Sequence, residues 1–255
     1  MKNKLFLLSE LLRRDLAARY AGSFGGPLWA VLNPAVLCAV YAFVFGGILK
    51  LPPPAGFRGG YVEFLLAGLL PWLGVQEAIT RAATSVSDQA HLVKKLRFPI
   101  ELLVASSLGA ALVIQTVGLT ILIVFLAISG RGGVHPGLLL LAFAFELLLL
   151  AGPALMLASL NVFFRDTAQI LPPVLMIAFW LTPIFYPGSL VPGFAARLLV
   201  FNPVRDLVAL FRSALFEAPV PPFGRVAAWS AVLLVVGFLG VRLFRRCRPS
   251  FADLL

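Results

Sequence analysis

The stretch LLVASSLGAALVIQTVGLTILIVFLAIS, residues 102–129, decides the fold class, because it carries no charge over a length that crosses a bilayer as a helix. Two further uncharged runs cover residues 27–49 and 167–196. Of the 255 residues, 60% are hydrophobic and 13% are charged, whereas a soluble domain is about 25% charged. The runs are also far longer than the segments of about ten residues that form transmembrane β-barrels. The sequence therefore predicts an all-α, polytopic membrane protein.

We expect one transmembrane domain, residues 1–255, with six spans at 27–49, 62–80, 101–128, 138–162, 168–187 and 225–243. The second span is the weakest, because Glu63 and Glu77 bracket it and Pro71 lies inside it. With the N-terminus inside, fourteen Lys and Arg residues fall on the cytoplasmic side and seven on the outer side. Cytoplasmic loops retain positive charge, so both termini are expected in the cytoplasm. The net charge of +10 then reflects topology and lipid anchoring, not nucleic-acid binding.

Residues 1–20 are too charged to span the membrane, yet Leu5, Leu8, Leu12 and Leu16 recur at helical spacing. This pattern predicts an interfacial helix on the inner leaflet. Such a helix either anchors the first span or helps to shape a substrate entrance.

The inner loop predicts a short helix over residues 87–98, with Ser87 or Asp88 as its N-cap and Pro99 as its stop. It combines apolar and basic side chains, which are Leu92, Val93, Lys94, Lys95, Leu96 and Arg97. Such a helix fits a groove on a soluble partner. The alternative is a basic loop that reaches the lipid head groups.

On the outer side, residues 188–224 form the longest connection. Asn202 and Pro203 give an N-cap followed by proline at the first helical position, which predicts a helix to about residue 217. We expect short re-entrant helices here, acting either as a structural cap or as an extracellular gate.

The sequence contains few residues of the kinds that carry out catalysis. The sequence has no GxxxxGK[ST] phosphate loop and only two histidines, so it offers little for an ATPase, a metal enzyme or an acid–base enzyme. Glu146 is the one clear charge inside a span, and it is either an ion-coupling site or a carboxylate hydrogen-bonded to a neighbouring helix. Asn33 and Pro34 predict a break in the first span. Aromatic residues in the fifth span either mark the outer interface or line a path for a sugar-bearing or amphipathic substrate.

Seven stretches, in order along the chain, resemble the membrane subunit of the ABC-2 type polysaccharide exporters, the permeases for O-antigen and teichoic acid. They are LLRRDLAARYAGSFGGPLWAVLNP (11–34), FLLAGLLPWLGVQEAI (64–79), HLVKKLRFP (91–99), LNVFFRDTAQILP (160–172), FWLTPIFYP (179–187), FNPV (201–204) and RPSFADLL (248–255).

The resemblance implies a homodimer in the bacterial inner membrane with two copies of a separate ABC ATP-binding subunit. The dimer would export an undecaprenyl-diphosphate-linked glycan. ATP and Mg would be bound by the partner, and this chain would have no catalytic, cofactor or metal site. The alternatives are another ABC-2 substrate, such as teichoic acid, capsule glycan or a different amphiphile, and a non-transporting scaffold that recruits a cytoplasmic enzyme.

By position, the resemblance assigns three groups of residues. The helix that couples to the ATPase would contain His91, Leu92, Val93, Lys94, Lys95, Leu96 and Arg97. The entrance for the lipid diphosphate would contain Arg13, Arg14 and Arg19. The channel would be lined by Trp29, Asn33, Tyr41, Phe45, Phe179, Trp180, Phe185 and Tyr186.

Overall fold

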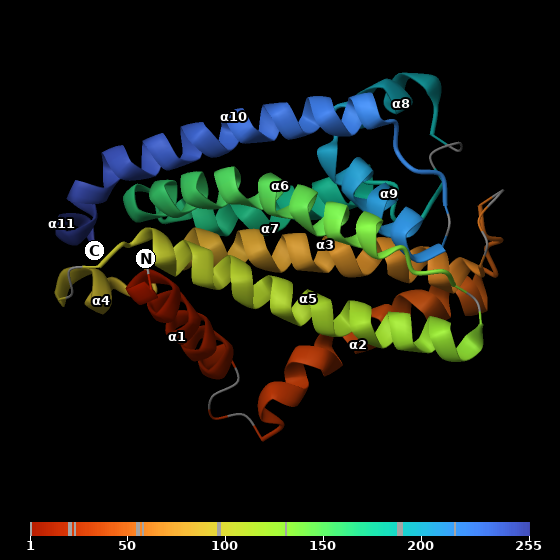
Figure 1. Ribbon diagram of the computed structural model, residues 1–255, viewed down its shortest axis with the longest axis horizontal. Helices are drawn as coiled ribbons and strands as arrows, with labels where there is room; N and C mark the ends of the chain where they lie inside the picture. The colour runs from red at the N-terminus through yellow and green to blue at the C-terminus, as the bar shows by residue number, and fades with distance from the viewer. Residues whose placement is uncertain are drawn as a thin grey trace.

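The computed structural model describes residues 2–19, 22, 24–54, 57, 59–95, 98–130, 132–187, 191–216 and 218–255. Every named element within these ranges is helical. Helices α3 (Tyr61–Thr84), α5 (Glu101–Ser129), α6 (Pro136–Phe163) and α10 (Phe223–Cys247) run alongside one another and form the body of the bundle (Figure 1).

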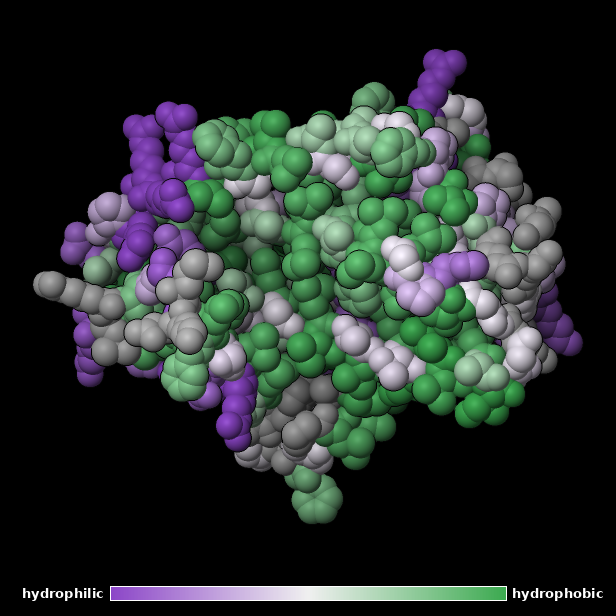
Figure 2. Space-filling view, viewed as in Figure 1, coloured by the Kyte–Doolittle hydropathy of each residue, from purple (hydrophilic) through white to green (hydrophobic). Residues whose placement is uncertain are grey.

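The two ends of the bundle differ. One end, here called the proximal end, holds α1 (Lys2–Arg19), α4 (Ala90–Lys95) and α11 (Phe251–Leu254) together with both termini (Figure 1). The opposite, distal end holds α8 (Gly193–Val200) and α9 (Pro203–Phe216). Figure 2 shows hydrophobic side chains across the middle of the molecule and large hydrophilic groups at the proximal end. This distribution is that of a polytopic membrane protein.

Five of the described helical segments are long and apolar enough to cross a membrane, and they are Val31–Ile48, Tyr61–Thr84, Glu101–Ser129, Pro136–Phe163 and Phe223–Leu254. The helix expected over residues 168–187 ends early. Helix α7 (Asp166–Leu181) has 16 residues, about 24 Å of helix, which is shorter than the hydrocarbon core. It stops because Thr182 adopts an extended backbone and Pro183 has no N–H to donate.

The predicted break at Pro34 is wrong, because α2 (Trp29–Tyr41) runs through this proline. Pro34 lies in the second turn, so only the carbonyl of residue 30 loses its usual donor. The irregularity comes later, as a π-helical stretch, Ala42–Ile48.

Helix α3 is the centre of the fold. Its side chains are mostly buried, and Trp72 is among the largest fully buried residues. It packs against α5, α6, α7 and α9. Helix α3 tolerates the two carboxylates that made it the weakest span in the sequence, because Glu63 is buried among its neighbours and Glu77 is paired with Arg81.

Helices α6 and α10 approach closely at a pair of glycines. A Cβ atom on Gly240 would lie 2.6 Å from the Gly152 carbonyl oxygen. Small residues allow such backbone contact, which is a common source of helix association in membranes.

At the proximal end, the C-terminal residues are fastened to the bundle. The Phe251 ring is fully buried between Phe163 and Phe244, with centroid distances of 6.3 and 5.3 Å. Arg248 contacts Glu101 at 3.4 Å and donates to the Phe98 carbonyl at 3.2 Å. These contacts hold the start of α5 and the loop before it against the end of α10.

At the distal end, Asn202 caps α9 as predicted, since its Oδ1 accepts from the Val204 N–H at 3.0 Å. The buried Asp206 carboxylate accepts from Arg225, whose single Nε–H is shared between the two carboxylate oxygens at 2.9 and 3.0 Å. This ion pair fixes α9 against the start of α10.

We predict that Gly240→Val lowers the free energy of unfolding by about 1–3 kcal/mol, because the new side chain overlaps the backbone of α6. Gly237→Val is the matched control, since a Cβ at Gly237 meets no atom within 4 Å. Thermal unfolding of both variants in detergent measures the difference. Equal unfolding temperatures would contradict this packing.

Candidate functional site

Two adjoining cavities form a groove between α2 and α3. Their volumes are about 490 and 200 Å³, and both are lined by Leu37, Leu73 and Gln76. The larger one reaches Arg81, near the proximal end of α3, and the smaller one reaches Trp72 and α7. We call the whole feature the α2–α3 groove.

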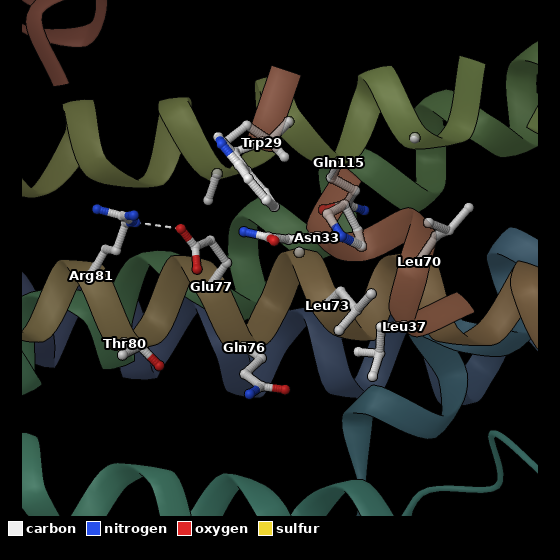
Figure 3. A pocket seen from close by; sticks show the side chains of 15 residues that line it. Trp29, Asn33, Leu37, Leu70, Leu73, Gln76, Glu77, Thr80, Arg81 and Gln115 are labelled. Carbon is white, nitrogen blue, oxygen red and sulfur yellow. Dashed lines mark hydrogen bonds and ion pairs between the residues drawn. The ribbon is translucent and has the colours of Figure 1, made fainter. Parts of the chain in front are cut away.

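The larger cavity has a polar lining. Figure 3 shows Trp29, Asn33 and Gln115 around one part of it, with Glu77 and Arg81 toward one end. Arg81 Nε donates to Glu77 Oε1 one helical turn away, so the two charges neutralise each other.

Gln115 of α5 reaches across α3 to α6. Its Nε2 donates to Glu146 Oε2 at 2.9 Å, and Glu146 has no exposed surface. The amide passes over Gly74, where a Cβ atom would lie within 2.5 Å of it, so only glycine leaves room for this crossing. Of the two sequence interpretations of Glu146, the hydrogen bond to a neighbouring helix is therefore confirmed.

Two residues that line the smaller, distal cavity, Tyr41 and Phe179, belong to an aromatic cluster. Tyr41, Phe45, Phe179, Trp180 and Phe185 form one cluster, with neighbouring ring centroids 4.8 to 6.1 Å apart. Such pairs add about 0.5–1.5 kcal/mol each beyond the burial of their area. We call these five residues the aromatic cluster.

The channel residues expected from the sequence thus fall into two groups. Trp29 and Asn33 lie in the polar part of the groove. The other six belong to the aromatic cluster or border it, since Tyr186 donates its hydroxyl to the Trp180 carbonyl at 2.9 Å. Phe185 is 4% exposed and is covered by its own chain, whereas Trp180 is 53% exposed. Trp180 is therefore the member of the cluster best placed to meet another molecule.

A buried arginine holds the cluster in place. After α7 ends, Pro183 and Ile184 present carbonyls that accept from Arg212 Nη1 and Nη2 at 2.9 and 2.7 Å. Arg212 Nε donates to the Phe64 carbonyl at 3.3 Å, and the guanidinium lies 3.5 Å above the Phe64 ring. The next carbonyl, that of Phe185, accepts from the Tyr61 hydroxyl at 2.7 Å. The carbonyls of Pro183, Ile184 and Phe185 thus all accept hydrogen bonds although they lie outside a helix.

The residues assigned to the coupling helix divide by exposure. His91, Lys94 and Lys95 are exposed on α4, Val93 is buried, and Leu92 packs half-buried against the core. Leu96 and Arg97 lie outside the described residues. The apolar side chains of α4 therefore serve the fold of this chain, and the basic ones face outward.

The predicted N-cap of α4 is wrong. The helix begins at Ala90, so neither Ser87 nor Asp88 precedes it directly. The Ser87 hydroxyl instead accepts from Asn161 Nδ2 at 3.1 Å, which joins this loop to the end of α6.

The residues assigned to the lipid-diphosphate entrance lie on α1. Arg13 and Arg14 are exposed, and Arg14 Nη2 lies 3.4 Å from His91 Nε2 on α4. The side chain of Arg19 lies outside the described residues. Helix α1 packs on α5 through Leu11, which is buried, and Leu12; of the predicted apolar stripe, Leu8, Leu12 and Leu16 are half-buried and Leu5 is 66% exposed.

Sequence reasoning missed Gln76, Gln115 and Arg212. The two glutamines stand out as amides inside apolar segments, which is a usable signal for polar sites in membranes. Arg212 gave no such signal, because its partners are backbone carbonyls distant in sequence. Within the described ranges, no group of three His, Cys, Asp or Glu side chains could hold a metal ion.

Comparison with known proteins supplies the family. The model of the ABC-2 type transporter family matches residues 7–216. The chain belongs to this family. This ABC-2 permease is a transport subunit, and its membership of the family implies a partner ATPase subunit.

Curated relatives match this ABC-2 permease along nearly its whole length. The O-antigen export system permease protein RfbA of Myxococcus xanthus is 30% identical, covering 97% of this chain and 94% of the relative. RfbA of Klebsiella pneumoniae is 26% identical, covering 100% and 98%. The polysialic acid transport protein KpsM of Escherichia coli is 24% identical, covering 93% and 92%.

We predict that Arg212→Met lowers the free energy of unfolding by about 3 kcal/mol or more, since the carbonyls of Pro183 and Ile184 lose their donor. Arg205→Met is the control, because Arg205 is on the same helix but only half-buried. Tryptophan fluorescence during thermal unfolding in detergent reports both variants. An Arg212→Met protein as stable as the control would refute the role of this arginine.

Proposed function

We propose that this chain is the membrane permease of an ATP-driven exporter of lipid-linked polysaccharide of the O-antigen type. The observation that carries the proposal is the α2–α3 groove, which places amides and then aromatic rings along one path at membrane depth. The names of the two RfbA relatives support the same substrate class, and that of KpsM, a polysialic acid transport protein, supports polysaccharide in general.

The lining of the groove suits sugars. Amide groups pair with hydroxyls as both donors and acceptors, and aromatic faces accept the apolar C–H faces of sugar rings. The one ion pair in the larger cavity, Glu77 with Arg81, is internally neutralised. A glycan can therefore contact this path without meeting an unpaired charge.

We place the proximal end in the cytoplasm. Exposed basic residues gather there on α1, α4 and the end of α10, and the positive-inside rule favours that orientation. Both termini would then be cytoplasmic. Helix α7 together with the clamped segment 182–187 would complete a sixth crossing as a broken helix, which membranes allow where protein covers the backbone.

A homodimer would complete the path. Helices α2 and α7 both present exposed apolar side chains, including Val36, Val40, Val174 and Ile177, beside the open groove. A second copy packed on these faces would enclose the groove, and Trp180 would meet it.

Energy would come from two copies of a separate ABC ATPase, which would bind ATP and Mg. On this chain, the exposed side chains His91, Lys94 and Lys95 of α4 are the proposed contact. Arg14, beside His91, would link the proposed entrance for the diphosphate to the ATPase contact.

We predict that Lys94→Glu with Lys95→Glu reduces the amount of co-purified ATPase by about tenfold or more, because reversed charges repel a complementary surface. Arg245→Glu with Arg246→Glu is the matched control, with the same charge change on exposed residues of α10. Affinity purification in mild detergent with quantitative mass spectrometry measures the ratio. Full retention of the ATPase in the α4 variant would contradict the docking assignment.

Export of a different amphiphile is the second candidate. An apolar cavity of about 370 Å³ lies on the α5 side of α2, lined by residues such as Cys38, Leu66 and Phe125, and it could hold a lipid chain. Deletion of the gene separates the candidates. Loss of surface glycan, with lipid-linked glycan accumulating inside, is the expected result. Unchanged surface glycan would contradict the proposal and favour the amphiphile or a scaffold.

A further inference from the structure

The polar part of the α2–α3 groove has the features of a ligand site within one subunit. Its volume of about 490 Å³ lies in the range of small-molecule sites. Trp29 and Asn33 of α2 and Gln115 of α5 lie around the same space (Figure 3). We infer that this space is a subsite for a single neutral sugar ring of the substrate, an inference that rests on the proposed function.

The hydrogen-bonding groups of the site are held in defined orientations. Gln115 uses its Nε2 for Glu146, and its Oε1 has no partner among the described residues. At the edge of the site, Gln76 uses its Oε1 to accept from Trp72 Nε1 at 3.1 Å, which leaves its NH₂ group as a donor. Gln115 Oε1 itself is buried against Gly74, so the group of these two that the site offers to a ligand is the exposed Gln76 amide, a donor in a fixed orientation.

A ligand hydroxyl both donates and accepts, so it can pair with either end of an exposed amide. Asn33, one helix away, adds an exposed amide with a further donor and acceptor. A sugar ring carries several hydroxyls at the spacing needed to meet more than one of these groups.

Charge separates a sugar from a diphosphate. Among the described lining residues, Arg81 is the cation, and it is paired with Glu77. Diphosphate recognition relies on available charge-assisted donors, which an internally paired arginine offers poorly. The Trp29 indole, 44% exposed, instead provides an apolar face for the ring. The site therefore fits a neutral, hydroxylated group.

Photo-crosslinking in cells that export the glycan tests this inference. Trp29 is replaced by p-benzoylphenylalanine, which keeps an aromatic ring at that place, and ultraviolet light is applied during export. The chain is then purified and probed for bound glycan. Leu32→p-benzoylphenylalanine is the matched control, because Leu32 is exposed nearby but does not line the cavity. The same replacement at Trp180 reports on the aromatic cluster.

We expect glycan on the chain with the probe at position 29 and at least about tenfold less at position 32. Mild acid, which breaks the sugar–phosphate bond, should leave the sugar attached. In addition, Asn33→Leu should lower the yield at position 29 about tenfold, whereas Leu32→Asn should not.

Three results would overturn the subsite. Sugar released by mild acid would mean that the cavity holds the lipid phosphate. Glycan crosslinked at position 180 but not at 29 would place the path elsewhere and leave the proposed function intact. No glycan at any position, in cells whose export depends on this chain, would also reject the subsite. Failure of the proposed function itself is seen separately, as export that continues after deletion of the gene.

Discussion

The arrangement of this permease depends on one buried guanidinium, that of Arg212. Arg212 would be costly to bury unless its donors were satisfied, and the carbonyls of Pro183 and Ile184 would be equally costly where α7 has ended. The guanidinium donates to these carbonyls, so its N–H groups and their oxygens are satisfied together. The same side chain reaches the Phe64 carbonyl, so one residue ties α3, α9 and the irregular segment together. Phe185, which follows directly, is thereby placed at the centre of the aromatic cluster.

Helix α3 is the second constraint, because it is both the centre of the bundle and one side of the groove. Its buried side packs against α6 and α9, and its other side borders the groove. Gly74 lets the Gln115 side chain cross it, and the hydrogen bond to Glu146 of α6 then holds Gln115 in place. A polar path can therefore exist beside a helix that holds the whole bundle together.

Local signals in the sequence were sufficient for much of the fold. The uncharged run at 102–129 lies in α5, and the Asn202–Pro203 pair starts α9 with the expected cap. Both features depend on neighbouring residues alone. Pro183 is a local signal for the early end of α7, but the bonds from Arg212 that satisfy the carbonyls after it could not be predicted this way. Nor could the exposure pattern of α4, which depends on the packing of Val93 against residues far away in the chain.

The site was predicted only in part for the same reason. Aromatic residues and Asn33 stood out by composition, but nothing in the sequence joined Trp29 and Asn33 to Gln115 or separated them from the aromatic cluster. Gln115 joins this group because its side chain crosses α3 at Gly74. The sequence suggested that the apolar residues of α4 would face a partner. In the fold, Leu92 and Val93 pack inward and the basic side chains are exposed.

Closing the groove covalently tests most directly whether it is the path of the substrate. Leu37 on α2 and Met176 on α7 both line its distal cavity. In a chain with Cys38 and Cys247 replaced by serine, Leu37→Cys and Met176→Cys would be joined by a reducible thiol crosslinker. Our account predicts that export stops when the two helices are crosslinked, continues in either single-cysteine chain, and returns on reduction. Undiminished export through the crosslinked protein would contradict it.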